Sequence, residues 1–531
     1  PFWLKFWPEP SSACHFPALG LDVKMGSQGK QLPEWVPKAV LVGGAAAAAL
    51  VTLRLLQTGS GKRAGGARAA GASDAHGVDG AAVKKAQAVA VEKYVSDVGT
   101  KLDAKAGEST LVKNGELEKY MAFKKEYQTK LMARPDVGEG QLLKVTDWYR
   151  LTPEDYDRTT FHIEVDVAGT SIEKLVNGAD GKALSVYATN DQKGVQQFLQ
   201  KMGLDPLEVV SVEEIAPQDE DGAVVLTTVE KLFTQYLDLF GKPTREFLKK
   251  LVPFAKDIME KVKIAELTLE RKTEDFQDRQ ARAYTFADYI MEYPSLQIPV
   301  DKYVELIPTI KQRVYSICSS SDYRPGKCQL LVVREDWEAK GGDTKFGLCS
   351  SFLTFCRPNG YMIGHSTHSV MKIPDDTMAH IFMAGLGTGL APFRAFVEQR
   401  KFQQSKGTKV GSMTLFFGGR YSKTEYYYRS EFEAYEKEGL LKCCNAWSRD
   451  TLGKKVYVQH KIKEEEEAIW EQLGKPGSKG YFFLCGSKQP EKDVYKTLLG
   501  IMQGKGSMSE AQAQRKMEEL QAAGRYVTEV Y

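Results

Sequence analysis

The chain has 531 residues and a formal net charge of +3, and 42% of its residues are hydrophobic. Such a length predicts several domains, and so small a charge argues against a general nucleic-acid-binding protein. The eight cysteines form no CxxC pair, and the seven histidines are scattered. We therefore expect a reducing compartment, with neither a disulfide framework nor a metal site.

Residues 1–24 precede Met25, where a plausible start of the form MGSQGKQLPEW follows. The segment shows no periodicity and resembles a translated spliced-leader RNA, of the kind that some protists add to their messages. We expect it to be a non-native leader outside the fold. A genuine N-terminal extension is the alternative.

A candidate membrane anchor spans residues 36–57. Its uncharged run, residues 39–53, is rich in alanine and shorter than the roughly twenty residues of a confident span. More basic residues follow the run than precede it, so the body is expected to face the cytosol, with the endoplasmic reticulum as the membrane. A targeting segment for a mitochondrion or plastid and an ordinary buried helix are the alternatives.

Residues 58–139 separate this segment from the folded part of the chain. They begin with a Gly/Ala/Ser-rich stretch that is typical of a flexible linker. They continue as a charged region that is expected to be helical, without a strong apolar stripe. No repeat is found.

Residues 140–372 are expected to form an antiparallel barrel with a helical insertion at about 192–305. The prediction depends on β-rich segments with turn residues between several of them. These segments are 159–167, 183–189, 313–318, 328–335 and 345–355.

Residues 376–531 alternate between apolar strand patterns and helical patterns, which predicts a doubly wound parallel sheet. The expected fold class is therefore α/β plus all-β. Ligands of such sheets bind beyond the carboxyl ends of the strands. The expected strands are 379–385, 412–419, 441–447, 480–486 and 525–530.

The first motif is MAGLGTGLAPFRAF, in which Gly385, Gly387 and Gly389 follow a strand and open a helix. Glycines let a phosphate approach the backbone, and a helix N-terminus offers free N–H groups. No GK[ST] follows, so the motif is not a P-loop. A glycine turn that only packs the helix against the sheet is the alternative.

The second motif, AWSRDTLGKKVYVQH, offers Ser448, Arg449, Lys455 and Tyr457. The polar and charged groups suit a 2′-phosphate, and the tyrosine ring suits an adenine. The motif therefore favours NADP over NAD. A solvated basic loop is the alternative.

The third motif is RVYSICSSS, in which Arg313 and Tyr315 share one face of a strand. Arg313 suits a pyrophosphate, Tyr315 a flat ring system, and Ser316 a reacting centre. An ordinary barrel strand is the alternative. Residues 346–351 form a second small-residue turn suited to a diphosphate, and Cys485 ends a strand, where a buried small hydrophobe is the alternative.

Together and in this order, the motifs resemble the ferredoxin–NADP reductase superfamily over about residues 140–531. Within it, the helical insertion resembles the NADPH–haemoprotein reductases, the diflavin enzymes of cytochrome monooxygenase reductase and sulfite reductase flavoprotein type. The resemblance covers the FAD/NADPH half only. Residues 57–139 are too few and too polar for a flavodoxin-like domain, so no FMN domain is expected there.

The resemblance implies an NADPH-dependent FAD flavoprotein reductase, an oxidoreductase of electron transport. NADPH would deliver a hydride to FAD, and single electrons would then pass to a separate carrier: a flavodoxin-like protein, a ferredoxin or a haemoprotein. A ferredoxin–NADP reductase-like enzyme and a non-catalytic flavoprotein subunit of a membrane complex are the alternatives.

The resemblance also implies site residues. Those for FAD are Arg313, Tyr315, Ser316, Leu331, Val332, Val333, Gly347, Leu348, Cys349, Ser350 and Tyr531. Those for NADPH are Gly385, Gly387, Thr388, Gly389, Ser448, Arg449, Lys455, Tyr457, Gln459 and Asp493. Those of the hydride path, expected to be catalytic, are Ser316, Cys485, Glu529 and Tyr531.

Three positions depart from the family pattern. Glu529 stands where aspartate is usual, Ser487 replaces the aspartate of a Cys-Gly-Asp triplet, and Tyr531 replaces a terminal tryptophan. The longer Glu529 implies slower hydride transfer. Glu529 and Tyr531 should point the same way from a strand, with the Tyr531 ring covering the flavin until nicotinamide displaces it.

Overall fold

The computed structural model describes residues 140–211, 226–270 and 273–531, all within one compact unit, Asp79–Tyr531. The expected leader, anchor and linker lie outside the described residues. Among the described residues, no helix has the length and apolar character needed to cross a membrane.

The first part of the fold is a six-stranded antiparallel sheet with the order β6-β3-β10-β1-β2-β7. An isolated bridge between Ile317, directly after β6, and Leu330 of β7 joins its two edges. Inward-facing side chains such as Leu143, Ile163 and Val186 form its core. The strands are β1 (Gln141–Arg150), β2 (Thr160–Asp166), β3 (Asp180–Tyr187), β6 (Arg313–Ser316), β7 (Lys327–Val333) and β10 (Tyr361–Lys372).

Residues 345–355, expected as a strand, are mostly helical, and the prediction was wrong there. Only Thr344–Phe346 is extended, as β9, which pairs with β8 (Asp336–Glu338); α11 (Leu348–Phe355) follows. Cys349 and Leu353 lie four residues apart and both enter the core of the antiparallel sheet, which is helical spacing. Strands β1 and β10 are absent from the sequence prediction, because polar residues interrupt their apolar pattern.

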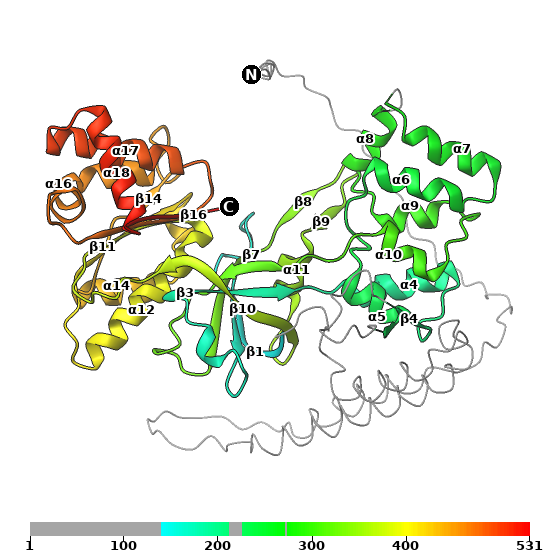
Figure 1. The fold of residues 1–531 in the computed structure, drawn as a ribbon, viewed down its shortest axis with the longest axis horizontal. Coiled ribbons are helices and arrows are strands. Elements are labelled where there is room, and N and C mark those ends of the chain that lie inside the picture. Colours follow the sequence, from blue (N-terminus) through cyan, green and yellow to red (C-terminus); the bar gives the residue numbers. More distant parts are fainter. Residues whose placement is uncertain (1–139, 212–225, 271–272) are drawn as a thin grey trace, which may run out of the picture. The chain divides into compact units, whose positions relative to one another are not determined.

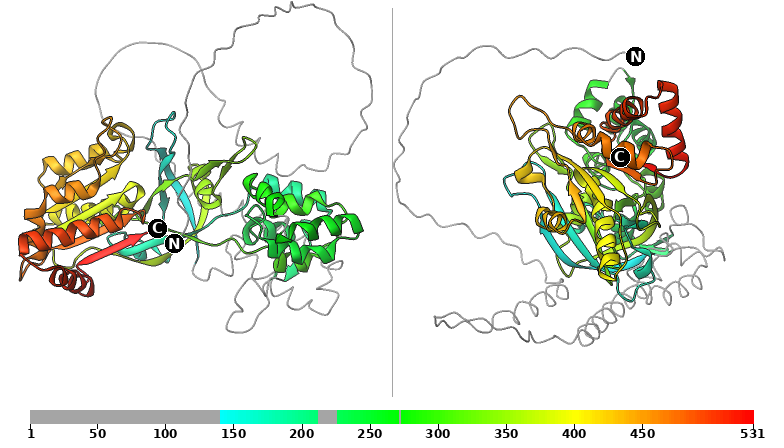
Figure 2. Two further views of the ribbon diagram at one scale, coloured as in Figure 1. Left: turned by 90° about the horizontal axis from the view of Figure 1, so that it is seen from above. Right: turned by 90° about the vertical axis from the view of Figure 1, so that its left-hand side faces the viewer.

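Between β3 and β6 the chain forms a cluster of helices with a core of its own, coloured green in Figure 2. Phe198, Phe233 and Tyr303 contact one another at its centre. Thr285 begins one helix with a capping box to Asp288. The helices are α4 (Gln192–Met202), α5 (Val229–Lys231), α6 (Arg245–Leu251), α7 (Ile258–Leu267), α8 (Thr273–Ala281), α9 (Phe286–Glu292) and α10 (Tyr303–Leu306).

The second part is a parallel sheet with the order β13-β12-β11-β15-β16. Alternate side chains build one core on each face: Met383 lies in one and Phe382 in the other. Helices α12 and α14 cover the first face, and α15, α17 and α18 cover the second (Figure 1). The elements are β11 (Ile381–Leu386), β12 (Met413–Gly419), β13 (Leu441–Cys443), β15 (Tyr481–Gly486), β16 (Tyr526–Val530), α12 (Ala391–Ser405), α14 (Arg429–Lys437), α15 (Val458–Glu464), α17 (Glu491–Gly506) and α18 (Glu510–Ala522). Both sheet types agree with the expected fold class.

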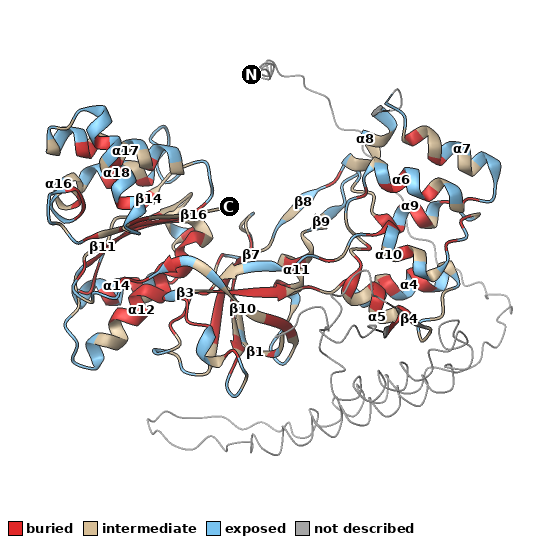
Figure 3. Ribbon diagram, viewed as in Figure 1, coloured by how far each residue is buried: buried red, intermediate tan, exposed pale blue. Residues whose placement is uncertain are grey.

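Helix α12 is buried on every side along Ala391–Arg400, as its red colour in Figure 3 indicates. One side packs on the parallel sheet, and another contacts the antiparallel sheet. The guanidinium of Arg394 donates to the carbonyl oxygen of Cys318 at 2.7 Å and to Gln329 at 2.8 Å. It also donates to Glu431 at 2.8 Å. The helix therefore joins the two sheets.

Candidate active site

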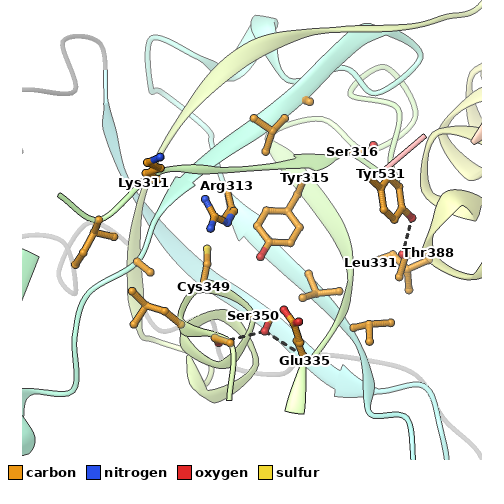
Figure 4. A pocket seen from close by; sticks show the side chains of 18 of the residues that line it. Lys311, Arg313, Tyr315, Ser316, Leu331, Glu335, Cys349, Ser350, Thr388 and Tyr531 are labelled. Carbon is orange, nitrogen blue, oxygen red and sulfur yellow. Dashed lines mark hydrogen bonds between the residues drawn. The ribbon is translucent and has the colours of Figure 1, made fainter. Parts of the chain in front are cut away.

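A cavity of about 930 Å³ lies where the antiparallel sheet, the start of α12 and the end of the chain meet (Figure 4). Its size is at the upper end of the range for small-molecule sites, so it can hold an extended ligand. Many of the residues expected for FAD and the hydride path line it. They are Arg313, Tyr315, Ser316, Leu331, Val332, Val333, Gly347, Leu348, Cys349, Ser350, Glu529 and Tyr531; Thr388, which was expected for NADPH, also lines it.

Tyr315 and Cys349 both line this cavity, and the Tyr315 hydroxyl points toward the Cys349 thiol (Figure 4). Burial raises the pKa of the Tyr315 phenol, and it raises the pKa of the Cys349 thiol to about 11, although a hydrogen bond with Tyr315 opposes the latter shift. Both groups therefore stay neutral at physiological pH. A neutral ring beside a neutral thiol suits a flat, largely apolar ring system.

The N-terminus of α11 opens beside the same cavity. Gly347 is the N-cap of this helix, and because glycine has no side chain, it gives the first N–H groups of the helix no side-chain acceptor. Ser350 accepts a hydrogen bond from the backbone N–H of Glu335 at 3.1 Å, which holds the turn in place. A helix start of this kind suits a phosphate.

The cavity has further lining residues that the sequence reasoning missed: Lys242, Lys311, Asp238 and Glu335. Lys311 lies two residues before Arg313, so the alternation of an extended chain was a usable signal. Asp238 and Lys242 lie some seventy residues upstream, and only folding brings them here. Burial raises the pKa of Asp238, and the nearby charge of Arg313 opposes that shift.

Ser316 and Glu529 line the cavity, whereas Cys485 is buried, lines neither this cavity nor the one beside it, and contacts Glu529. The Ser316 hydroxyl donates to Oε2 of Glu529 at 3.2 Å, and the Cys485 thiol lies 3.9 Å from the same oxygen. Burial, and then the neighbouring Glu529 carboxylate, raise the pKa of Cys485, so it stays a protonated thiol that donates. The fold thus brings together the ends of two strands of the parallel sheet and a strand of the antiparallel sheet, which are distant in sequence.

Tyr531, the last residue, is held rather than frayed. Its backbone N–H donates to the carbonyl oxygen of Gly486 at 3.1 Å, and its hydroxyl lies 2.8 Å from that of Thr388 (Figure 4). The residue as a whole remains 66% exposed. A tethered but accessible ring can cover a flat ligand and can also move away from it.

A second cavity, of about 400 Å³, adjoins the first and shares Val333, Thr388 and Tyr531 with it. It lies beyond the carboxyl ends of β11 and β12, where ligands of parallel sheets bind. The expected NADPH residues that line it are Gly387, Thr388, Ser448, Tyr457 and Gln459.

The remaining expected residues line neither cavity. Arg449, Lys455 and Asp493 are exposed. Gly389 packs so closely on β15 that a Cβ would meet the carbonyl oxygen of Cys485 at 2.0 Å, and one at Gly385 would crowd Phe393. These two glycines serve helix packing, whereas Gly387 lines the cavity with a φ of +56°.

Two arginines of the second cavity were missed, Arg158 and Arg420. Arg420 directly follows β12, and the rule on strand ends would have found it. Its guanidinium donates to Asp157 at 2.8 and 2.9 Å and to Glu425 at 2.8 Å. Asp157 belongs to the loop between β1 and β2, so this contact also joins the two sheets.

The fold and the paired cavities define a class: a two-domain protein in which a curled antiparallel sheet and a dinucleotide-type parallel sheet share one site. Residues 139–352 match the family model of the FAD binding domain. Residues 382–496 match that of the oxidoreductase NAD-binding domain.

Curated relatives agree with these matches. The chain is 34% identical to the sulfite reductase [NADPH] flavoprotein component of Saccharomyces cerevisiae, over 78% of this chain and 40% of the relative. It is 30% identical to the NADPH–cytochrome P450 reductase of Drosophila melanogaster, over 70% and 56%. It is 33% identical to the mitochondrial pyruvate dehydrogenase [NADP(+)] of Euglena gracilis, over 73% and 21%.

The chain therefore belongs to the diflavin reductase family within the ferredoxin–NADP reductase superfamily, and the matched part is the FAD- and NADPH-binding half. It spans about half or less of the length of these relatives. The family resemblance expected from the motifs is confirmed.

Proposed function

We propose that the protein is an NADPH-dependent FAD flavoprotein reductase that passes electrons to a separate carrier protein. The observation that carries this proposal is that Glu529 contacts both Ser316 and the buried Cys485 beside a cavity that both domains line. FAD, when bound, accepts a hydride at its N5 position and releases electrons one at a time.

The residues of the first cavity fit FAD. Arg313 and the start of α11 supply the positive charge and the free N–H groups that a diphosphate needs. Tyr315 supplies a ring face for the flat system, and Ser316 supplies a hydroxyl near the reacting position. Leu331, Val332 and Val333 line the cavity and would form the wall beside the ring.

The residues of the second cavity fit NADPH. Gly387 and Thr388 would contact the diphosphate at the start of the helix. Ser448, Tyr457 and Gln459 would hold the 2′-phosphate and adenosine. Arg449, Lys455 and Asp493 would close on the nucleotide from the exposed surface. Tyr531, shared by both cavities, would cover the flavin and exclude water until nicotinamide arrives.

The domain division that we propose places the FAD-binding domain at residues 140–372 and the NADPH-binding domain at 376–531. Two sheets that share no strand support it. The helical cluster, about 192–305, would be an insertion in the first domain, since it stands between β3 and β6 and has its own core.

The acceptor is the open part of this proposal. A flavodoxin-like domain or protein, a ferredoxin and a haemoprotein are the candidates. Stopped-flow comparison of the three acceptor classes would decide between them, because the physiological acceptor should be reduced at a rate comparable to turnover.

Association with a membrane through residues 36–57 is a separate proposal, with the endoplasmic reticulum as its site and a mitochondrion or plastid as the alternative. The apolar run and the basic residues after it support it. Fractionation of cells that express the full chain or a variant without residues 36–57 tests it. Recovery of both proteins in the high-speed supernatant would contradict it.

The activity itself is tested on purified protein reconstituted with FAD. We expect a flavin spectrum that bleaches on anaerobic addition of NADPH, more slowly with NADH, and NADPH-dependent reduction of ferricyanide. Arg313→Ala should lose FAD, whereas Lys372→Ala, at the exposed end of β10, should keep it. A colourless protein without ferricyanide reduction would overturn the proposal.

A further inference from the structure

Strand β10 carries a serine that neither the motifs nor the family matches single out. The pairing of β10 with β3 shifts register between His368 and Lys372, so residues 369–371 do not follow the regular ladder. A shift of this kind turns side chains in new directions. The Met371 side chain packs into the core on the first face of the parallel sheet, the one that contains Met383. Ser369 lies beside Glu529.

The hydroxyl of Ser369 is oriented by two hydrogen bonds. Its oxygen accepts from the backbone N–H of Met371 at 3.0 Å. Its own hydrogen is then free for Oε1 of Glu529, which lies at 2.8 Å. A hydroxyl that already accepts from the backbone has few other directions for its hydrogen, so the donation to Glu529 is well defined.

The two oxygens of the Glu529 carboxylate have different neighbours. Oε1 is held by Ser369, whereas Oε2 faces Ser316 and Cys485. Among the ion pairs of the described residues, none involves Glu529, so neutral donors from three strands fix its position. Removing Ser369 would leave the carboxylate tied only at its Oε2 side.

Glutamate has one more rotatable bond than aspartate, and its carboxylate therefore loses more freedom when it is held in one place. Strand β16 fixes its backbone, but the backbone does not fix the carboxylate. The bond to Ser369 at 2.8 Å is shorter than the bond to Ser316 at 3.2 Å, so it sets the direction of the side chain.

We propose that Ser369 is a positioning residue for the hydride step, which holds the Glu529 carboxylate so that its other oxygen meets Ser316 and Cys485. This inference rests on the proposed function. A shift of about 1 Å in a positioned group is enough to slow a reaction up to about a hundredfold. The extra methylene of Glu529 lengthens the side chain, and its carboxylate contacts the Ser369 hydroxyl.

The test compares Ser369→Ala with Ser369→Thr, which keeps the hydroxyl, and with Ser366→Ala. Ser366 is the matched control: it lies on the same strand and bonds instead to the carbonyl oxygen of Leu175. In anaerobic single-turnover reduction by NADPH, Ser369→Ala should be slower by about tenfold. Ser369→Thr and Ser366→Ala should stay within about twofold of wild type, and the KM for NADPH should change little in all three.

A second measurement needs no cofactor. Urea unfolding of the apoprotein is followed for Ser369→Ala, Glu529→Ala and the double variant. If the pair interacts, the losses in free energy of unfolding will be less than additive. The same cycle with Ser366→Ala in place of Ser369→Ala should be additive.

The outcomes separate the two proposals. A wild-type flavin that NADPH does not reduce overturns the proposed function and, with it, this inference. Normal reduction by wild type and equal rates for Ser369→Ala and Ser366→Ala overturn only the role of Ser369. An additive unfolding cycle also overturns it, because the contact would then not hold Glu529.

Discussion

Two of the regions in which the two sheets contact each other differ in kind. Around Arg394 the contact is closed: that side chain and Glu398 are at most 1% exposed, and the partners include backbone and amide groups of the antiparallel sheet. Around Glu529 and Tyr531 the contact borders a cavity, and hydroxyls and half-exposed side chains meet across it.

The difference assigns separate tasks to the two regions. Buried charges with full sets of partners tolerate little movement, because losing one partner leaves the other unpaired. Exposed pairs and single hydroxyl contacts break and reform at small cost. The closed region therefore fixes how the two sheets face each other, and the open region can admit ligand and move a ring aside.

The largest effect is expected at the closed region. Arg394→Ala should lower the free energy of unfolding by about 3–5 kcal/mol, because Glu431 loses its buried partner and the buried Glu398 is left with Arg324 as its ion-pair partner. Lys401→Ala, on the same helix and paired with Glu438 near the surface, should cost less than about 1 kcal/mol. Urea unfolding of both apoproteins measures this, and equal losses would remove the distinction between the regions.

A pH effect should also arise in the closed region. Burial, and then the charge of Arg394, lower the pKa of His162 from 6.5 to about 3, while Glu164 opposes the shift. The unfolded chain therefore binds a proton at His162 near pH 6.5, whereas the folded protein does not. The free energy of unfolding consequently falls as the pH drops through this range. Between pH 7 and 5 wild type should lose about 2 kcal/mol more than His162→Gln, in which this titration is absent.

Urea unfolding of the two proteins at both pH values measures the difference, and the carboxylates common to both cancel. The neutral His162 ring bonds to the Tyr428 hydroxyl at 2.9 Å, and Arg394 lies over the ring of Tyr428. Parallel pH profiles for wild type and His162→Gln would mean that the imidazole can be protonated in the folded state.

At the open region the expected change is in cofactor preference rather than stability. Tyr531→Ala should raise the kcat/KM for NADH relative to NADPH by about tenfold, corresponding to ~1.4 kcal/mol. Without the ring, nicotinamide has nothing to displace, and binding depends less on the 2′-phosphate. Tyr531→Phe keeps the ring but loses the bond to Thr388, so it should retain most of the preference. An unchanged preference in Tyr531→Ala would show that the Tyr531 ring has no role in cofactor choice.

The smallest effect is expected for Asp157→Asn, which weakens the exposed contact between the β1–β2 loop and Arg420. Asp157 is 69% exposed, and Glu425 remains as a partner of the arginine. The free energy of unfolding should fall by less than about 1 kcal/mol. A loss as large as that of Arg394→Ala would show that this exposed contact stabilises the protein as much as the closed region does.

Much of the site was predictable because side chains in strands alternate. Arg313 and Tyr315, or Glu529 and Tyr531, share a face whatever the rest of the fold does, and all four line the cavity. The strand ends of the parallel sheet were equally readable, since long apolar runs between helices leave few other assignments. The helix α11 was missed because its threonine and phenylalanines favour strands locally, whereas the residues that it buries are spaced as on a helix.

Other features had no local signal. Lys242 and Asp238 reach the cavity only through the helical cluster, and Arg158 only through the loop between β1 and β2. Ser369 is one of two serines on β10, and a register shift decides which of them meets Glu529. Such contacts depend on where two distant strands cross.

The sequence by itself determined the two kinds of sheet, the phosphate-suited turns and the alternation that places the site residues on common faces. These are local properties, set by side-chain periodicity and by the conformational freedom of glycine. Only the tertiary structure decided that α12 is buried along Ala391–Arg400 and that the Tyr531 hydroxyl contacts Thr388. It also decided that each carboxylate oxygen of Glu529 accepts a hydrogen bond from a different serine. These depend on the packing of one sheet against the other, which no short stretch of chain encodes.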